Sequence, residues 1–146
     1  MTTTRIPFET YMRKGAVDLL TDFRQEFDIK LQIYPARPRS IAAPCAFIDR
    51  LREAIDFDGA FRRRVCQVDV IVCHGLFDGK DTAEQRDAFV DNFVEWTTDR
   101  PHAAYGTTVM EPRSIEDDPA YVPEWIESPN TYYASTIILE GFAGGL

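Results

Sequence analysis

The sequence lacks any apolar run of the roughly 18 residues that a membrane-spanning helix needs. Its first seven residues, MTTTRIP, contain no secretory apolar stretch, so we expect an intracellular product. Cysteine is scarce, and Cys45, Cys66 and Cys73 are an odd number without close pairing. This pattern favours free thiols in a reducing compartment.

Sequence motifs for metals and nucleotides are also missing. The chain has no C-x-x-C, no H-x-x-x-H and neither of the common glycine-rich phosphate loops. The segments DFDG and DGKD do not continue into a calcium-binding loop, so we expect them to be turns. We therefore expect no metal and no cofactor.

Candidate catalytic side chains are few. Cys73 and His74 are adjacent, but neighbouring side chains of a strand point to opposite faces, so they are not expected to share a proton. A buried structural cysteine is the preferred interpretation, and His102 is expected at the surface. The acids at 116–118 suit an acid–base pair in principle, although a solvated turn is more usual. The sequence thus predicts a protein that is not an enzyme.

Charge is unevenly distributed along the chain. The net charge is −8, which argues against a general nucleic-acid binder. Residues 1–80 carry 13 basic and 11 acidic residues, a net of +2, whereas residues 81–146 carry 3 and 13, a net of −10. If this asymmetry survives in space, the basic patch of one copy can meet the acidic patch of the next. A head-to-tail contact of this kind closes into a ring when the rotation permits.

Apolar periodicity organises the first part of the chain. Residues 7–27 have the three-and-four spacing of an amphipathic helix, and residues 28–34 alternate like a half-buried strand. Three prolines make residues 35–44 an extended connector. Residues 45–57 fit either a helix or a strand, with a strand favoured at the start, and a turn is expected at 56–59.

The clearest strand is predicted at residues 62–77, with apolar side chains on both faces. Cys66, Val68, Val70 and Val72 fall on one face, and Val65, Ile71 and Cys73 on the other. A helix is predicted at 82–98, because Asp81 and Glu84 have the spacing of a capping box.

The last third is richer in proline. We expect a short strand in TTVMEP, an ordered loop with aromatic residues at 116–125, a final strand at 131–142 and a flexible tail at 142–146. The element order predicts a single α+β domain spanning 1–146, with a mostly antiparallel sheet packed by two main helices. A chain of this length suits one such domain.

Two arginine-rich segments stand out. Arg37 and Arg39 flank Pro38, and because prolines remove backbone donors, a protein-contact arm is preferred over an anion site or a catalytic loop. The run 62–64 is interpreted, in order of preference, as a solvated start of a strand, an intersubunit ion-pair patch or a DNA contact. Tyr121 and Trp125 also fit a contact surface, although core packing suits Trp125 equally well. The candidate interface residues are Arg37, Arg39, Arg62, Arg63, Arg64, Glu116, Asp117, Asp118, Tyr121 and Trp125.

Several segments, taken in order, resemble the tail terminator proteins of long-tailed bacteriophages and related gene-transfer particles. The likeness spans Arg37 to Phe142 and is carried by order and spacing rather than by one diagnostic motif. The segments are ARPRSIAAPCAFIDRLREAI, VDVIVCHGLFDGKDTAEQRDAFVDNFVEW, EDDPAYVPEW and YYASTIILEGF.

The resemblance implies a ring-forming structural protein without a reaction or a cofactor. In that family a homohexameric ring caps the head-proximal end of the tail tube, stops tube polymerisation and offers a surface to the head-side connector. The implied partners are further copies of the chain, the tail tube protein and the connector or stopper protein. DNA would pass through the lumen without specific binding, no membrane is involved, and the protein would end in the virion after assembly in the host cytoplasm.

Three alternatives stay open at this point. One is a head–tail connector or head-closure protein from the neck of the same particle. Another is a small cytoplasmic enzyme or ligand-binding domain that uses Cys73, His74 or the acidic loop. The third is a host-encoded monomeric interaction module.

Overall fold

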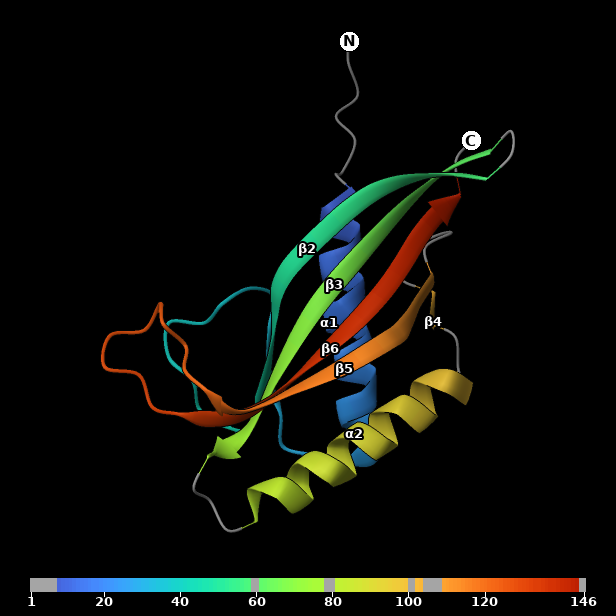
Figure 1. Cartoon of the computed structure of the whole chain (residues 1–146). Coiled ribbons are helices and arrows are strands. Elements are labelled where there is room, and N and C mark those ends of the chain that lie inside the picture. The colour runs from blue at the N-terminus through green and yellow to red at the C-terminus, as the bar shows by residue number, and fades with distance from the viewer. Residues whose placement is uncertain (1–7, 59–60, 78–80, 100–101, 104–108, 145–146) are drawn as a thin grey trace.

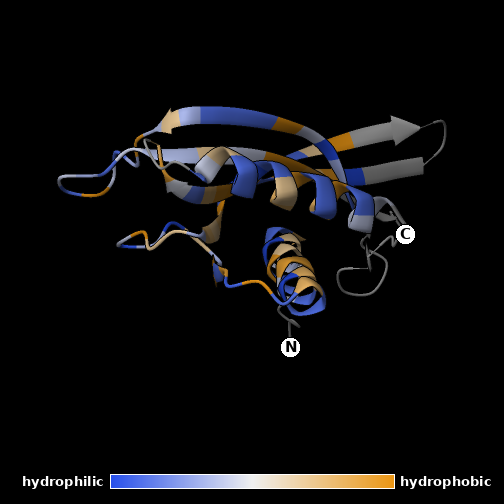
Figure 2. Cartoon of the chain, turned by 90° about the horizontal axis from the view of Figure 1, so that it is seen from below, coloured by the Kyte–Doolittle hydropathy of each residue, from blue (hydrophilic) through white to orange (hydrophobic). Residues whose placement is uncertain are grey.

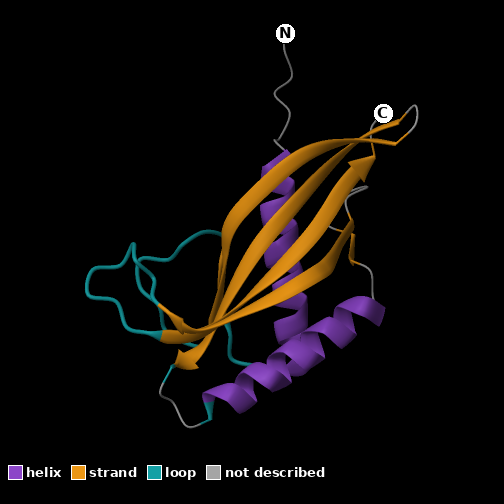
Figure 3. Cartoon of the chain, in the orientation of Figure 1, coloured by secondary structure: helices purple, strands orange, loops and turns teal. Residues whose placement is uncertain are grey.

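A single mixed sheet with helices packed against it organises the chain (Figures 1 and 3). The computed structural model describes residues 8–58, 61–77, 81–99, 102–103 and 109–144. Within these ranges six strands form one sheet in the order β1-β2-β3-β6-β5-β4, in which β1 runs parallel to β2 and the other pairings are antiparallel. The elements are α1 (Phe8–Phe27), β1 (Gln32–Tyr34), β2 (Cys45–Asp58), β3 (Phe61–Leu76), α2 (Thr82–Asp99), β4 (His102–Ala103), β5 (Val109–Tyr121) and β6 (Tyr132–Gly144). The predicted α+β class is confirmed.

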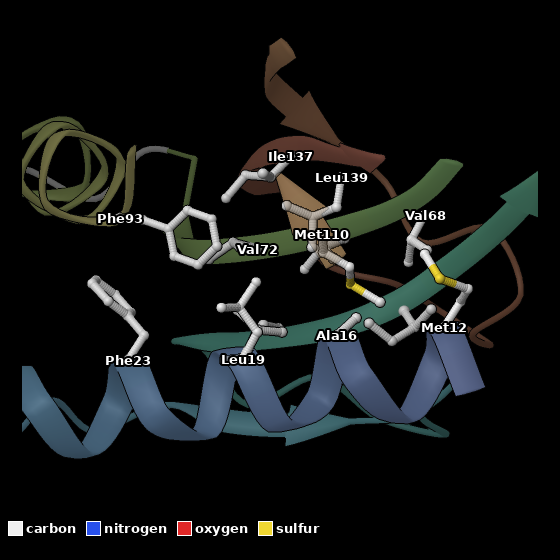
Figure 4. Close-up of a cluster of buried hydrophobic side chains, with 14 of the residues drawn as sticks. Met12, Ala16, Leu19, Phe23, Val68, Val72, Phe93, Met110, Ile137 and Leu139 are labelled. Carbon is white, nitrogen blue, oxygen red and sulfur yellow. The ribbon is translucent and has the colours of Figure 1, made fainter. Parts of the chain in front are cut away.

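The two helices bury their apolar stripes in one core cluster with the sheet. The stripe of α1 includes Met12, Ala16, Leu19 and Phe23, which are all buried because three-and-four spacing places them on one side of the helix. Figure 4 shows these side chains pointing toward the strands and toward Phe93 of α2. Figure 2 shows the axis of α1 crossing that of α2 on this side of the sheet. Both helices lie within one residue of their predicted limits, and neither is long and apolar enough to cross a membrane.

An aromatic cluster joins the helices to each other. The ring of Phe23 makes edge-on contacts with Phe89 and Phe93, each with 5.2 Å between ring centroids, and a tilted contact with Trp96 at 5.4 Å. Edge-on contacts are favourable because the positive edge of one ring meets the negative face of another. Phe23 therefore links α1 to three side chains of α2.

The opposite face of the sheet holds a second, smaller core cluster. It is built from Cys45, Phe47, Ile71, Cys73, Tyr132 and Ala134, with Tyr34, Ile41, Tyr121 and Trp125 packed against it. Alternation along β3 sends Cys66, Val68, Val70 and Val72 into the first cluster and Ile71 and Cys73 into the second. The prediction of a central strand with two apolar faces is confirmed.

The structure corrects some limits in the first half of the chain. The predicted strand at 28–34 is shortened to β1. The ambiguous segment 45–57 is strand throughout, because β2 pairs with β3 from Cys45↔Cys73 to Asp58↔Phe61, with one register shift between Ile48 and Arg50. Residues 56–58, expected in a turn, therefore belong to β2. Residues 59 and 60 lie outside the described residues.

The largest correction concerns β5. Residues 116–121, expected in a loop, continue the strand that begins at Val109, and only 122–125 fit the loop prediction. Pro112 and Pro119 are tolerated because β5 lies near the sheet edge and its register shifts at Pro112/Ser114 and Asp118/Tyr121. The predicted tail is also shorter, since residues 142–144 belong to β6 and residues 145–146 lie outside the described part.

Candidate interaction surface

The proline-rich arm, residues 35–44, lies against the loop 122–131 at one end of the sheet (Figure 1). Trp125 Nε1 donates a 2.8 Å hydrogen bond to the carbonyl oxygen of Pro38, and the Tyr132 hydroxyl donates to that of Ile41 at 3.2 Å. These bonds hold the arm on its own chain, where it covers the second core cluster.

The two arginines of the arm have different environments. Arg37 Nε donates to Asp49 Oδ1 at 2.5 Å, and its guanidinium lies 4.7 Å from the centroid of the Trp125 ring. The hydrogen bond with Asp49 raises the pKa of Arg37 further. Both arginines are exposed. Arg37 is held in place by Asp49 and Trp125, and Arg39 is placed to contact a partner.

The arginine run at 62–64 is placed only in part. Arg64 Nε donates to Glu53 Oε1 at 2.5 Å, and its guanidinium lies 4.9 Å from the centroid of the Phe8 ring. Arg62 and Arg63 lie on β3, opposite Phe57 and Asp56 of β2, but their side chains are outside the described part of the structure. The patch interpretation of Arg62 and Arg63 stays a prediction.

The three acids at 116–118 separate into two groups. Glu116 and Asp118 are exposed, and Asp118 Oδ1 accepts a local hydrogen bond from the amide of Ala120 at 3.0 Å. Asp117 instead accepts hydrogen bonds from Arg86 Nε and Ser135 Oγ, both at 2.9 Å. All three residues are exposed, but Asp117 is held by Arg86 and Ser135, so Glu116 and Asp118 are better placed to contact a partner.

Ser135 extends this contact to a buried histidine. His74 Nε2 and Ser135 Oγ are 3.0 Å apart, and both residues are buried. His74, Ser135 and Asp117 are the residue types of a hydrolase triad, but they are connected differently. In a triad the histidine lies between the serine and the aspartate, whereas here the serine lies between the other two. Since Ser135 donates to Asp117, it accepts from His74, and the chain of bonds ties α2 to β3, β5 and β6 as a structural clamp.

The thiols are placed for packing. Cys73 lies in the second core cluster, whereas the His74 ring contacts Phe89 of α2, so the two adjacent side chains are on opposite faces as predicted. The side-chain hydrogen bond with Cys45 and burial raise the pKa of Cys73, and burial raises that of Cys66 to about 12. Both thiols are protonated at neutral pH and are poor nucleophiles.

A polar groove of about 470 Å³ opens where the arm meets β5. Its lining includes Arg37, Asp49, Asp118, Glu124 and Trp125, so carboxylates outnumber cations. Tyr121 also lines it, and burial raises the pKa of its hydroxyl. Tyr121 and Trp125 are half-buried in this position and contribute to both the core and the surface.

Sequence reasoning missed Arg86 and Ser135. Arg86 is the single basic residue of α2, which is otherwise acidic, and this isolation is the one available signal. It also missed an apolar groove of about 250 Å³ between the helices, lined by Phe27, Val72, His74, Phe89 and their neighbours. The groove arises from the crossing of α1 and α2, which no local pattern specifies.

The arm offers a direct test of its anchoring. Replacing Trp125 with phenylalanine keeps an aromatic ring beside Arg37 but leaves the Pro38 carbonyl without its donor. We expect the free energy of unfolding in urea to fall by about 1 kcal/mol. The control Tyr34→Phe, whose bond to Gln32 is exposed, should change it by less than about 0.5 kcal/mol. Equal effects of the two substitutions would contradict the anchoring role.

No protein-family model matches the chain, and no curated protein matches it.

Proposed function

We propose that the chain is a structural virion protein that forms a homohexameric ring on the head-proximal end of a phage-type tail tube. The ring stops tube polymerisation and presents a surface to the head-side connector, and it uses no cofactor. The observation that carries the proposal is the ordered series of segments from Arg37 to Phe142 that resembles tail terminators. In the fold these segments supply the arm, β2, β3, α2, β5 and β6.

The internal bonding of the reactive side chains favours assembly over catalysis. His74 and Ser135 belong to the chain of hydrogen bonds that ties α2 to the sheet. Cys73 packs against Cys45 under the arm. Each of these side chains already has a structural task. An enzyme that used Cys73 would have to open the second core cluster.

The surface residues divide into two roles under this proposal. Arg39, Glu116 and Asp118 are exposed and make direct contacts with neighbouring subunits or with the tube. Arg37, Tyr121 and Trp125 fix the shape of the arm and of the polar groove beside it.

Electron microscopy of particles made without this chain tests the proposal. We expect overlong tubes without heads, because nothing would stop tube growth, and supplying the wild-type chain in trans should restore tails of uniform length. Tails of normal length beside filled, unattached heads would contradict termination and would assign the chain to the head side of the neck. Normal infectious particles would contradict any neck function.

A further inference from the structure

The sheet has two long edges that the described strands leave largely open. β1 pairs with β2 only at Cys45–Phe47, and β4 pairs with β5 only at Val109–Met110. The remaining lengths of β2 and β5 lie on opposite sides of the sheet (Figure 1). Open edge strands are contact sites unless charge or proline protects them.

The two edges differ in charge. We define the basic edge as residues 49–53 of β2 together with Arg37 and Arg64, which bind Asp49 and Glu53. It carries four arginines and two carboxylates, a net of +2. We define the acidic edge as residues 111–118 of β5, with four carboxylates and one arginine, a net of −3. Arg86 of α2 binds Asp117 and also Asp87. Including Arg86 and Asp87 in the acidic edge leaves its net charge at −3.

Internal ion pairs leave the arginines outermost on the basic edge. On the basic edge the carboxylates of Asp49 and Glu53 are engaged by Arg37 and Arg64, and Arg50 is exposed. On the acidic edge Glu116 is exposed, and Arg113, which is also exposed, pairs with Glu140 at 2.9 Å. Two neighbouring carboxylates bind arginines of these edges: Glu140 binds Arg113, and Asp69 of β3 binds Arg52. Counting them makes the acidic edge −4 and the basic edge +1, so neither edge changes sign among the side chains that the structure describes.

Each edge also has one exposed aliphatic side chain close to it. Ile55 of β2 is 56% exposed, and Val122, which follows directly after β5, is 42% exposed. Aliphatic side chains next to charged ones provide the apolar component that protein interfaces need.

We infer that the basic edge of one copy docks against the acidic edge of the next copy. The occupant of each edge is a second copy of this chain, because each edge is complementary in charge to the other and the two face in opposite directions. Such a contact is heterologous, and it closes into a ring when the rotation between copies permits. This inference rests on the proposed ring and identifies the surfaces that build it.

Charge reversal tests the contact with purified protein. Arg50→Glu lowers the net charge of the basic edge from +2 to 0, and Glu116→Arg raises that of the acidic edge from −3 to −1. We expect each variant alone to associate at least about tenfold more weakly than wild type in sedimentation velocity at low salt, because the attraction between the two edges is then reduced or lost. The neutral variants R50Q and E116Q keep the shape of the edges and should weaken association by a smaller factor.

Mixing the two reversed variants gives the sharper result. The edge that carries the introduced glutamate of one variant then meets the edge that carries the introduced arginine of the other. The alternate contacts in the ring join an unmodified basic edge to an unmodified acidic edge, as in wild type. An equimolar mixture should therefore regain wild-type association as a ring of alternating subunits, and native mass spectrometry should find equal numbers of each. Asp91→Arg, an exposed reversal on α2, is the matched control and should associate like wild type.

Three outcomes would overturn the inference. They are a wild-type chain that stays monomeric at every concentration, single variants that associate like wild type, and a mixture that fails to regain association. The outcome is separable from the proposed function, because overlong tubes in particles lacking the chain would support termination even if these edges made no contact.

Discussion

Replacing Phe23 with alanine is expected to lower the free energy of unfolding by about 3–5 kcal/mol. Phe23 is 1% exposed, and its ring contacts Phe27, Phe89, Phe93 and Trp96. Truncation removes apolar burial and leaves a cavity between α1 and α2 that the sheet prevents from collapsing fully. Urea unfolding followed by circular dichroism measures the loss.

The matched control is Phe77→Ala, because Phe77 is 55% exposed. It should change the free energy of unfolding by no more than about 0.5 kcal/mol. A loss below about 1.5 kcal/mol for Phe23→Ala would show that the two helices are not packed through this ring, contrary to the structure.

The second large effect is a loss of stability on mild acidification. Burial, followed by the positive charge of Arg86, lowers the pKa of His74 from 6.5 to about 4. The unfolded chain therefore binds this proton at a higher pH than the folded chain, so acid favours unfolding. The loss begins as pH falls through 6.5, levels off below 4, and approaches about 3 kcal/mol. The midpoint of urea unfolding, measured from pH 7.5 to 4, tests this dependence.

Carboxylates also titrate near the acidic end of this range, so the comparison is between variants. His74→Gln retains an amide donor for Ser135 but has no titrating group, and we expect its stability to depend less on pH between 6.5 and 5. His102→Gln removes the other histidine, which is expected at the surface, and should keep the wild-type slope. Identical slopes for wild type and His74→Gln would contradict the burial of a neutral His74.

The elements predicted best are those with a strong local pattern. The stripe of Met12, Ala16 and Leu19 predicted α1, and the two apolar faces of residues 65–73 predicted β3 as the centre of the sheet. Only the start of β5 was predicted, as the short strand in TTVMEP, because Pro112 and Pro119 normally indicate a loop. Their tolerance depends on pairing with β6, a contact that only the assembled sheet provides.

The sequence indicated which residues form the candidate surface, but not how their side chains are arranged. The arm was correctly predicted to be a connector without helix or strand, but its hydrogen bond from Trp125 to Pro38 joins residues far apart in the chain. The same holds for Asp117, whose partners Arg86 and Ser135 come from a helix and another strand. A sequence pattern reports local conformation, whereas these bonds depend on which strands become neighbours.

The most direct test of the central claim is the length of tail tubes grown with the purified chain. Tube protein from the same particle would be polymerised with increasing amounts of the chain, and tube lengths would be measured by electron microscopy. The account predicts that tubes shorten as the chain is added and that a gold-labelled chain is found at one tube end only. Unchanged tube lengths, or label distributed along the tube walls, would contradict it.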